Sequence, residues 1–175
     1  MNVTFMKQKL FTKSAFKVAL TCPRQLYYYG DESYANQNND DSFLMALAEG
    51  GFQVGELAKI YYSVDDANDI KEKDYQSSIN VTNERLKQSD VNIAEAAFRY
   101  KDCFVRVDIL KKTGTDIELV EVKAKSWTEE DSFLNKKGEV ASGIREYLYD
   151  VAFQKWVVVN ALKDLYPNKK FKVKA

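Results

Sequence analysis

Three consecutive runs between residues 91 and 123 have the side-chain alternation of β-strands, and they limit what this chain can fold into. The runs cover residues 91–99, 104–111 and 117–123 and are separated by gaps of turn length. In the second and third runs, apolar side chains occupy both alternating faces, a pattern typical of strands covered on both sides. The runs therefore predict a sheet that is buried between helices.

Apolar residues at helical spacing surround these strands. We expect helices over residues 14–20 with Ser14 or Thr12 as cap, from Pro23 onward, and over residues 43–62, 81–88 and 143–166. Loops are expected at residues 31–41 and 125–142, and a fourth strand begins near Phe171. This order predicts an α/β or α+β fold with a mixed central sheet flanked by helices.

The length of 175 residues fits a single domain over residues 1–175. The abrupt end in or near the fourth strand is compatible with a fragment of a longer protein that has further domains beyond residue 175. No apolar stretch approaches the roughly 18 residues of a membrane span, and residues 1–9 lack the apolar core of a signal peptide. We expect a soluble, cytoplasmic protein without a membrane partner.

Charge and rare residue types exclude several classes of function. Lys plus Arg and Asp plus Glu both number 26, so nucleic acid would have to be bound by a local patch. The chain has no histidine, which excludes Ser-His-Asp and Cys-His nucleophiles and His-based metal sites. Its two cysteines, Cys22 and Cys103, are too few for a zinc or iron–sulfur site built from this chain alone. Any chemistry must use carboxylates, lysines, tyrosines or hydroxyl groups.

The second and third runs predict a hairpin whose register follows from its turn. A two-residue turn at Gly114-Thr115, or a four-residue turn over residues 113–116, places Asp108 opposite Glu121. A three-residue turn would separate the faces of the two carboxylates. Alternation groups the side chains of the second run into one face with Val105, Val107 and Ile109 and another with Phe104, Arg106, Asp108 and Leu110.

Two carboxylates that face each other in a covered sheet need a compensating cation, because like charges repel and burial of a charge is costly. Mg²⁺ and Mn²⁺ prefer such oxygen ligands. Lys123, two residues after Glu121, points to the same face, where an ammonium can neutralise a scissile phosphate or orient the attacking water. The alternative is a structural ion pair at an exposed strand edge; the facing Asp108 in a two-sided apolar hairpin favours catalysis.

These residues resemble the motif of the PD-(D/E)xK nuclease superfamily. The motif reads Val107-Asp108, with Val107 in place of the proline, then twelve residues and Glu121-Val122-Lys123. Residues 10–14 and 22–28 resemble the opening of the RecB-like branch, which includes CRISPR-associated nucleases. Residues 150–154 resemble its later helix with a glutamine. Together these segments cover most of the chain from residue 10 to about residue 160.

The resemblance implies a restriction-endonuclease-like core and a metal-dependent nuclease that hydrolyses phosphodiester bonds, with DNA expected rather than RNA. Asp108, Glu121 and the Val122 carbonyl would hold Mg²⁺ or Mn²⁺, and Lys123 would be the catalytic lysine. Gln154 would help to position that lysine or the substrate.

Gln154 also has a structural interpretation. It lies on the inward face of its helix with Tyr147, Val151 and Val158. A structural role as a hydrogen-bonded amide of the core therefore explains this position as well as a functional role does. The tyrosine that often follows this glutamine four residues later in the family is Val158 here.

A metal ligand of the family is missing. RecB-like members often carry a histidine four residues after a glycine on the helix before the sheet, and here Gly51 is followed by Gly55. Glu95 on the first strand is the preferred substitute, ahead of Glu49 and Glu56. Glu95 can equally be an exposed strand residue, and Glu56 is more simply a solvated helix residue.

The surroundings of Cys22 resemble the first cysteine of the iron–sulfur site found in some relatives. Three partner cysteines would be needed, and only Cys103 exists. No iron–sulfur cluster is expected within this chain, although a longer parent could supply the missing ligands.

Nucleic acid is expected to contact a local basic patch drawn from Arg24, Lys123, Lys125, Lys136 and Lys137, with affinity that falls as salt rises. Because the histidine ligand is missing, a second function stays open. It is a catalytically inactive module of nuclease fold that binds nucleic acid or acts as a scaffold in a larger DNA-processing protein.

Overall fold

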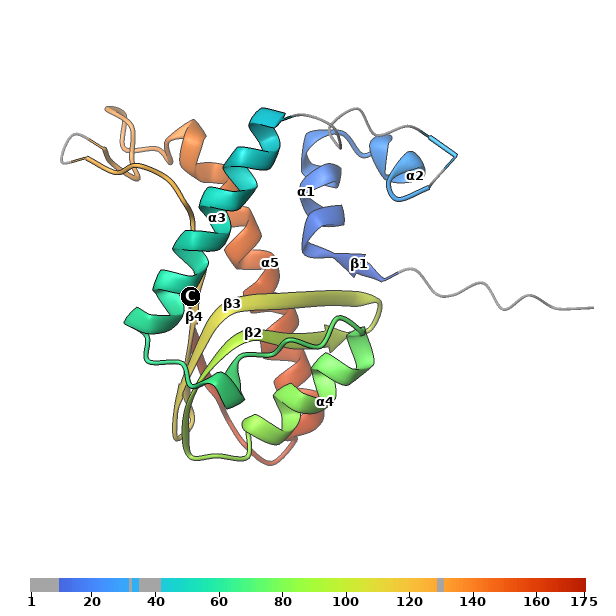
Figure 1. Ribbon diagram of the computed structural model, residues 1–175, viewed down its shortest axis with the longest axis vertical. Coiled ribbons are helices and arrows are strands. Elements are labelled where there is room, and N and C mark those ends of the chain that lie inside the picture. The colour runs from blue at the N-terminus through green and yellow to red at the C-terminus, as the bar shows by residue number, and fades with distance from the viewer. Residues whose placement is uncertain (1–9, 32, 35–41, 129–130) are drawn as a thin grey trace, which may run out of the picture.

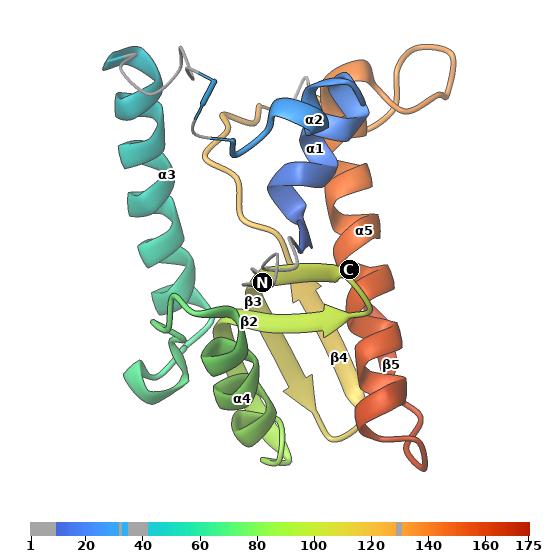
Figure 2. The same ribbon diagram turned by 90° about the vertical axis from the view of Figure 1, so that its right-hand side faces the viewer.

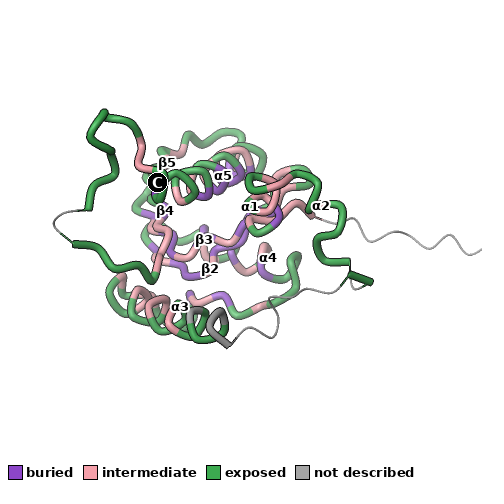
Figure 3. The backbone as a smooth tube through the Cα atoms, turned by 90° about the horizontal axis from the view of Figure 1, so that it is seen from above, coloured by how far each residue is buried: buried purple, intermediate pink, exposed green. Residues whose placement is uncertain are grey.

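The computed structural model describes residues 10–31, 33–34, 42–128 and 131–175, and these residues form a mixed sheet flanked by helices (Figure 1). The strands are β1 (Phe11–Thr12), β2 (Asp90–Tyr100), β3 (Cys103–Thr113), β4 (Asp116–Val120) and β5 (Lys172–Lys174). The helices are α1 (Lys13–Thr21), α2 (Gln25–Tyr28), α3 (Ser42–Tyr61), the 3₁₀ turn η1 (Asp66–Asn68), α4 (Tyr75–Arg85) and α5 (Ser142–Leu165). Viewed from above, α5 lies along one side of the sheet and α3 along the other (Figure 3). The expected α+β class is confirmed at this level.

The strand β3 is the centre of the sheet. It pairs antiparallel with β2 along one edge, and its other edge is shared by β1, which is parallel to it, and β4, which is antiparallel. β5 adds to β4 in parallel, so the strand expected near Phe171 is confirmed. The two-residue β1 has no counterpart among the expected elements, because so short a strand has no periodicity of its own.

The β3–β4 hairpin has the predicted register. Thr113 pairs with Asp116, which leaves Gly114-Thr115 as a two-residue turn, and Leu110 pairs with Leu119. Gly114 has a φ of +58°, a conformation that glycine adopts without the steric cost of a side chain. The turn therefore sets residue 108 opposite residue 121.

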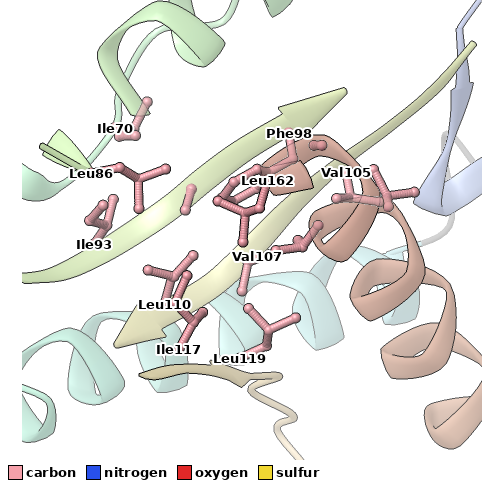
Figure 4. Packing of buried hydrophobic residues seen from close by; sticks show 14 of the residues in the cluster. Ile70, Leu86, Ile93, Phe98, Val105, Val107, Leu110, Ile117, Leu119 and Leu162 are labelled. Atoms are coloured by element: carbon pink, nitrogen blue, oxygen red, sulfur yellow. The ribbon is translucent and has the colours of Figure 1, made fainter. Parts of the chain in front are cut away.

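Side chains from the sheet and α5 form the buried core (Figure 4). Val105, Val107 and Leu110 of β3 belong to this cluster, whereas Ile109, although buried, lines a cavity instead. The expected grouping of Ile109 with Val105 and Val107 is therefore wrong. The alternation of β3 side chains breaks between Val107 and Ile109. The facing residue on β2 is Glu95, which lies between the Ala94–Ile109 and Ala96–Val107 pairs and has a φ of +55°.

Local hydrogen bonds explain where two helices begin. Thr12 accepts from the N–H of Ala15 at 3.2 Å and caps α1, so of the two expected caps Thr12 is confirmed and Ser14 lies within the helix. Asp74 accepts from the N–H of Ser77 at 2.8 Å, so α4 begins at Tyr75 rather than at residue 81. The polar first half of α4 resembles a loop in sequence, and only the cap indicates the helix.

α4 covers the open edge of β2. The hydroxyl of Thr82, which is buried, accepts from the backbone N–H of Ala97 at 2.8 Å. That bond satisfies a strand-edge donor that would otherwise be buried without a partner.

Among the described helices, none combines the length and the apolar character needed to cross a bilayer. Three expected segments lie wholly or partly outside the described residues: residues 1–9, interpreted above as lacking a signal peptide, residues 32 and 35–41 of the loop expected at 31–41, and residues 129–130 of the loop expected at 125–142.

Candidate active site

β1 and β4 pair with the same edge of β3, and the stretch of that edge between them has no partner among the described strands. We call this stretch the gap. β1 pairs with residues 103–104 of β3, and β4 pairs with residues 109–113. Lys13 follows β1 directly, the segment that begins at Glu121 follows β4 directly, and Asp108 lies in the part of β3 between the two partners. Figure 2 shows α1, which begins at Lys13, above the strands and beside α5. Two chain segments that leave the sheet therefore meet at this gap.

The ammonium of Lys13 is shared by two carboxylates. Its Nζ lies 3.4 Å from Oδ1 of Asp108 and 3.1 and 3.2 Å from the two carboxylate oxygens of Glu121. The side chain of Glu121 is 6% exposed, whereas those of Lys13 and Asp108 are 24% and 25% exposed. Asp108 and Glu121 thus lie on one face, as the hairpin register predicts, and a lysine of the chain stands between them.

The backbone leaves the β-ladder at this point. The N–H of Val122 donates to Oδ2 of Asp108 at 2.8 Å, and β4 ends at Val120. The strand expected to reach residue 123 is therefore three residues shorter. Lys123 donates from its ammonium to Oε1 of Glu121, so this irregular segment supplies both a carboxylate and a second cation.

The middle of α5 supplies two buried polar side chains, Asp150 and Gln154. Nε2 of Gln154 donates to Oε2 of Glu121 at 2.7 Å and to Oδ1 of Asp150 at 3.1 Å. Oδ2 of Asp150 has no hydrogen-bond partner among the described residues and lies 3.7 Å from Nζ of Lys123. The helix therefore fixes one oxygen of Glu121 and holds a buried carboxylate near Lys123.

Burial and charge act on these groups in opposite directions. Burial raises the pKa of Asp108, with Glu121 adding to the shift and Lys13 opposing it. Burial and Glu121 likewise raise the pKa of Asp150. Burial also disfavours the charge of Glu121, but Lys13, Lys123 and Gln154 outweigh it and lower the pKa of Glu121. Glu121 is thus the carboxylate held most firmly in its ionised form.

The cluster has an excess of negative charge. Burial disfavours the ammonium of Lys13, but Asp108 and Glu121 outweigh burial and raise the pKa of Lys13. With every group ionised, three carboxylates face two ammonium groups, and the formal charge is −1. A site of this charge favours a cation over an anion.

A cavity of about 950 Å³ lies between α3 and the sheet and reaches Asp108. Glu95 lines the same cavity, at the position opposite Asp108 in the β2–β3 register. Burial and the charge of Asp108 raise the pKa of Glu95. Gly51 and Gly55 of α3 border the cavity, and a Cβ atom at either position would meet nothing within 4 Å. Glu95 is therefore close enough to Asp108 to interact with it electrostatically, and its side chain is half-buried rather than exposed.

The other two candidate substitute ligands lie on α3. Glu56 borders the cavity but is paired with Lys59, whose Nζ lies 2.7 Å from Oε1 of Glu56. Glu49 is exposed. Neither side chain contacts the cluster around Lys13.

The expected basic patch is not assembled in one place. Nζ of Lys125 lies 5.5 Å from the ring centre of Tyr147, and Nζ of Lys123 lies 5.9 Å from the same ring. Figures 1 and 3 show α2, which Arg24 precedes, on the opposite side of the molecule from the segment of residues 131–141 that contains Lys136 and Lys137. The backbone N–H of Lys125 donates to the carbonyl of Lys123 at 2.9 Å. Among the described residues, no side-chain hydrogen bond or ion pair joins Arg24, Lys125, Lys136 or Lys137 to the cluster.

Two members of the cluster, Lys13 and Asp150, are not identified as site residues from the sequence. A signal exists for each of them. Lys13 is the first residue of α1, where the positive end of the helix disfavours a lysine. Asp150 lies four residues before Gln154 and so shares its inward face, which is an unusual position for a carboxylate.

The described residues contain no group of three or more His, Cys, Asp or Glu side chains arranged to hold a metal ion. Asp108 and Glu121 are the two carboxylates that converge on one point, and Lys13 lies at that point. No protein-family model, curated protein or solved structure matches the chain significantly.

Proposed function

We propose that this chain is a metal-dependent nuclease of the PD-(D/E)xK type, RecB-like, with its sheet as a restriction-endonuclease-like core and DNA as the expected substrate. The observation that carries the proposal is the convergence of Asp108 of β3 and Glu121, the first residue after β4, on one cation. Lys123 and Gln154 both bond to Glu121. Of the four side chains that the sequence motif assigns to one site, Lys123 and Gln154 are thus in contact with Glu121, and Lys13 connects Asp108 to Glu121.

The donors at this point suit a hard divalent cation. Mg²⁺ is commonly bound by one or two carboxylates together with water and substrate phosphates, rather than by a complete protein cage. The cluster has an excess of one negative charge, and the buried Oδ2 of Asp150 has no hydrogen-bond partner in the described part of the chain. We therefore assign Mg²⁺ or Mn²⁺ to Asp108 and Glu121, with the Val122 carbonyl and Glu95 as further candidate ligands.

Hydrolysis of a phosphodiester forms a bond between a water oxygen and phosphorus, breaks the bond to the leaving ester oxygen, and moves a proton from the water to the leaving group. A bound divalent cation supplies charge neutralisation at the phosphoryl oxygens. Lys123 can orient the attacking water or neutralise the charge that develops on the phosphate. Gln154 holds one oxygen of Glu121 and thereby fixes the orientation of that carboxylate.

A second candidate function is a binding or scaffolding module of nuclease fold without catalysis. Lys13 bonds to both carboxylates, so the chain itself supplies a cation that compensates their charge. The cavity beside Asp108 also has more acidic than basic side chains, which disfavours a phosphate backbone inside that cavity and hence cleavage at Asp108. The acidic side chains are Glu56, Asp66, Asp69, Glu72, Glu95 and Asp108, and the basic ones are Lys59, Lys71, Lys73 and Arg106.

The test is cleavage of labelled single- and double-stranded DNA and RNA with Mn²⁺ or Mg²⁺. We expect wild type to cleave and Asp108→Asn and Glu121→Gln to lose about 10²-fold or more in rate, because each weakens the binding of the cation that would neutralise charge at the reacting phosphate. Glu118→Gln is the matched control: Glu118 is an exposed carboxylate on β4, three residues before Glu121. Its activity should be unchanged.

The outcomes separate the two candidate functions. Loss of cleavage in both site variants but not in Glu118→Gln supports the nuclease. Wild-type protein that binds DNA with salt-dependent affinity, yet cleaves nothing with either cation, supports the non-catalytic module. Cleavage that survives Asp108→Asn at the wild-type rate overturns the assigned site.

A further inference from the structure

The side chain of Lys13 stands where a divalent cation held by Asp108 and Glu121 would have to bind. Its Nζ lies within 3.1–3.4 Å of oxygens from both carboxylates. Mg²⁺ binds its oxygen ligands at about 2.0–2.1 Å, so an ion bound to both carboxylates would overlap with this ammonium. The two cations cannot occupy the point together.

The helix that carries Lys13 does not favour this position for a lysine. Lys13 is the first residue of α1, and the first turn contains no acidic residue. The unpaired N–H groups of a helix N-terminus repel a cation. The ammonium is therefore held by the two carboxylates across the gap in the sheet rather than by its own helix.

The charge of the cluster also fits an exchange of cations. With Lys13 present, the three carboxylates and two ammonium groups sum to −1. If a divalent ion replaced Lys13, the three carboxylates would face that ion and Lys123, and the charge would be zero. Replacement neutralises the cluster, whereas addition of the ion beside Lys13 would leave it positive.

We propose that Lys13 is an internal counterion that exchanges with the divalent cation. In the metal-free protein it holds Asp108 and Glu121 together and offsets their repulsion, and it leaves when the metal binds. This inference rests on the metal site of the proposed function and adds its regulation: the metal affinity of wild type is reduced by competition from the chain's own lysine.

The test is Mn²⁺ binding measured by titration calorimetry on wild type, Lys13→Met, Lys17→Met and Asp108→Asn. Methionine keeps the length of the side chain and removes its charge. We expect Lys13→Met to bind Mn²⁺ roughly 5- to 150-fold more tightly than wild type, the range of typical coupling between two ligands. Lys17, exposed one turn later on α1, is the matched control and should bind as wild type does.

Four results are decisive, and they separate this inference from the proposed function. Tighter binding by Lys13→Met alone supports the exchange. Equal or weaker binding by Lys13→Met, with binding by wild type, overturns the exchange and leaves the metal site intact. Binding by Lys13→Met but not by wild type supports the exchange and overturns a metal-dependent activity of wild type. Absence of binding in all four proteins overturns both.

A second measurement uses the wild-type chain and does not depend on the folding of a variant. Limited acetylation of lysines, read by mass spectrometry, reports how accessible each ammonium is. We expect Lys13 to become more reactive when Mg²⁺ is added, because it loses its carboxylate partners. Lys59, which is 23% exposed and paired with Asp69 at 3.0 Å, is the internal control and should not change. Unchanged reactivity of Lys13 at saturating Mg²⁺ overturns the exchange.

Discussion

The buried interior where α5 meets the sheet has an apolar half and a charged half, which are held together in different ways. In the apolar half, Val157, Val158 and Leu162 of α5 are buried among apolar side chains of the sheet. In the charged half, Asp150 and Gln154 of the same helix are just as deeply buried, but they join the charged cluster around Glu121. The strand β3 changes in the same way, with apolar neighbours along most of its length and Asp108 at the gap.

The two halves differ in how their side chains contribute to the free energy of unfolding. In the apolar half, each side chain contributes to the free energy of unfolding through the area that it buries, and the effects of distant substitutions on that free energy should add. In the charged half, the contribution of each group depends on its partners, because removal of one leaves another charge buried without compensation. The apolar half should therefore determine how stable the fold is, and the charged half should respond to pH, metal and paired substitution.

The largest effect is expected in the apolar half. Phe98 is 1% exposed within the core cluster, and Phe98→Ala should lower the free energy of unfolding by about 3–5 kcal/mol through lost contacts and the cavity that remains. Urea unfolding followed by circular dichroism measures the change. A loss that depends on pH between 5 and 8 would contradict the distinction between the halves, since Phe98 has no charge to couple.

A smaller effect is expected for Lys13→Met in metal-free buffer. Loss of the shared ammonium leaves Asp108 and Glu121 facing each other, which should lower the free energy of unfolding by about 2–3 kcal/mol, below the range for a fully buried pair because Lys13 and Asp108 are partly exposed. The double variant with Asp108→Asn should recover part of the loss, since neighbouring charges are coupled. Urea unfolding of the four proteins in this cycle measures the coupling.

The control for this cycle is the exposed ion pair on the same hairpin, in which Nζ of Lys111 lies 3.0 Å from Oε2 of Glu118. Glu118→Gln should leave stability unchanged within error, because exposed pairs contribute little. If it matched Lys13→Met, burial would not distinguish the two pairs. Strict additivity of Lys13→Met and Asp108→Asn would show that the two groups act independently.

The smallest effect concerns Asp150 and depends on pH. Burial and Glu121 raise the pKa of Asp150, so the folded protein disfavours its ionised form. The penalty is present above the raised pKa of the folded state and disappears as the pH falls through that pKa. The stability of Asp150→Asn relative to wild type should therefore be greater at pH 7 than at pH 4. Unfolding curves at both pH values give this difference, and a constant difference would contradict it.

Much of the β3–β4 hairpin is predictable because residues close together in the sequence determine its register. The turn parity around Gly114 is sufficient to place Asp108 opposite Glu121. The sequence cannot show that the side chain of Asp108 accepts a hydrogen bond from the N–H of Val122. That bond replaces strand pairing at this point, and β4 ends at Val120. Nor does it show the left-handed backbone at Glu95, where the expected alternation of β3 breaks. Both features depend on neighbours in space rather than in sequence.

The cluster is predictable only in part for the same reason. Glu121 and Lys123 are two residues apart, and Gln154 is indicated by its inward position on α5. Lys13 reaches the site through β1, whose two residues form no pattern. In the sequence, the need for a cation between the carboxylates is evident, but which cation meets it is not.

The Lys13 contacts join parts of the chain that are far apart, 95 residues from Asp108 and 108 residues from Glu121. The β3–β4 hairpin closes over two residues, so it forms with little loss of chain entropy, whereas the contacts of Lys13 must close a loop of about a hundred residues. Contacts of such long range slow folding, and we expect the N-terminal segment to dock last. Until it does, the two carboxylates repel each other and no complete site exists. We therefore expect the charged cluster to assemble at the end of folding and to be absent from a partly folded chain.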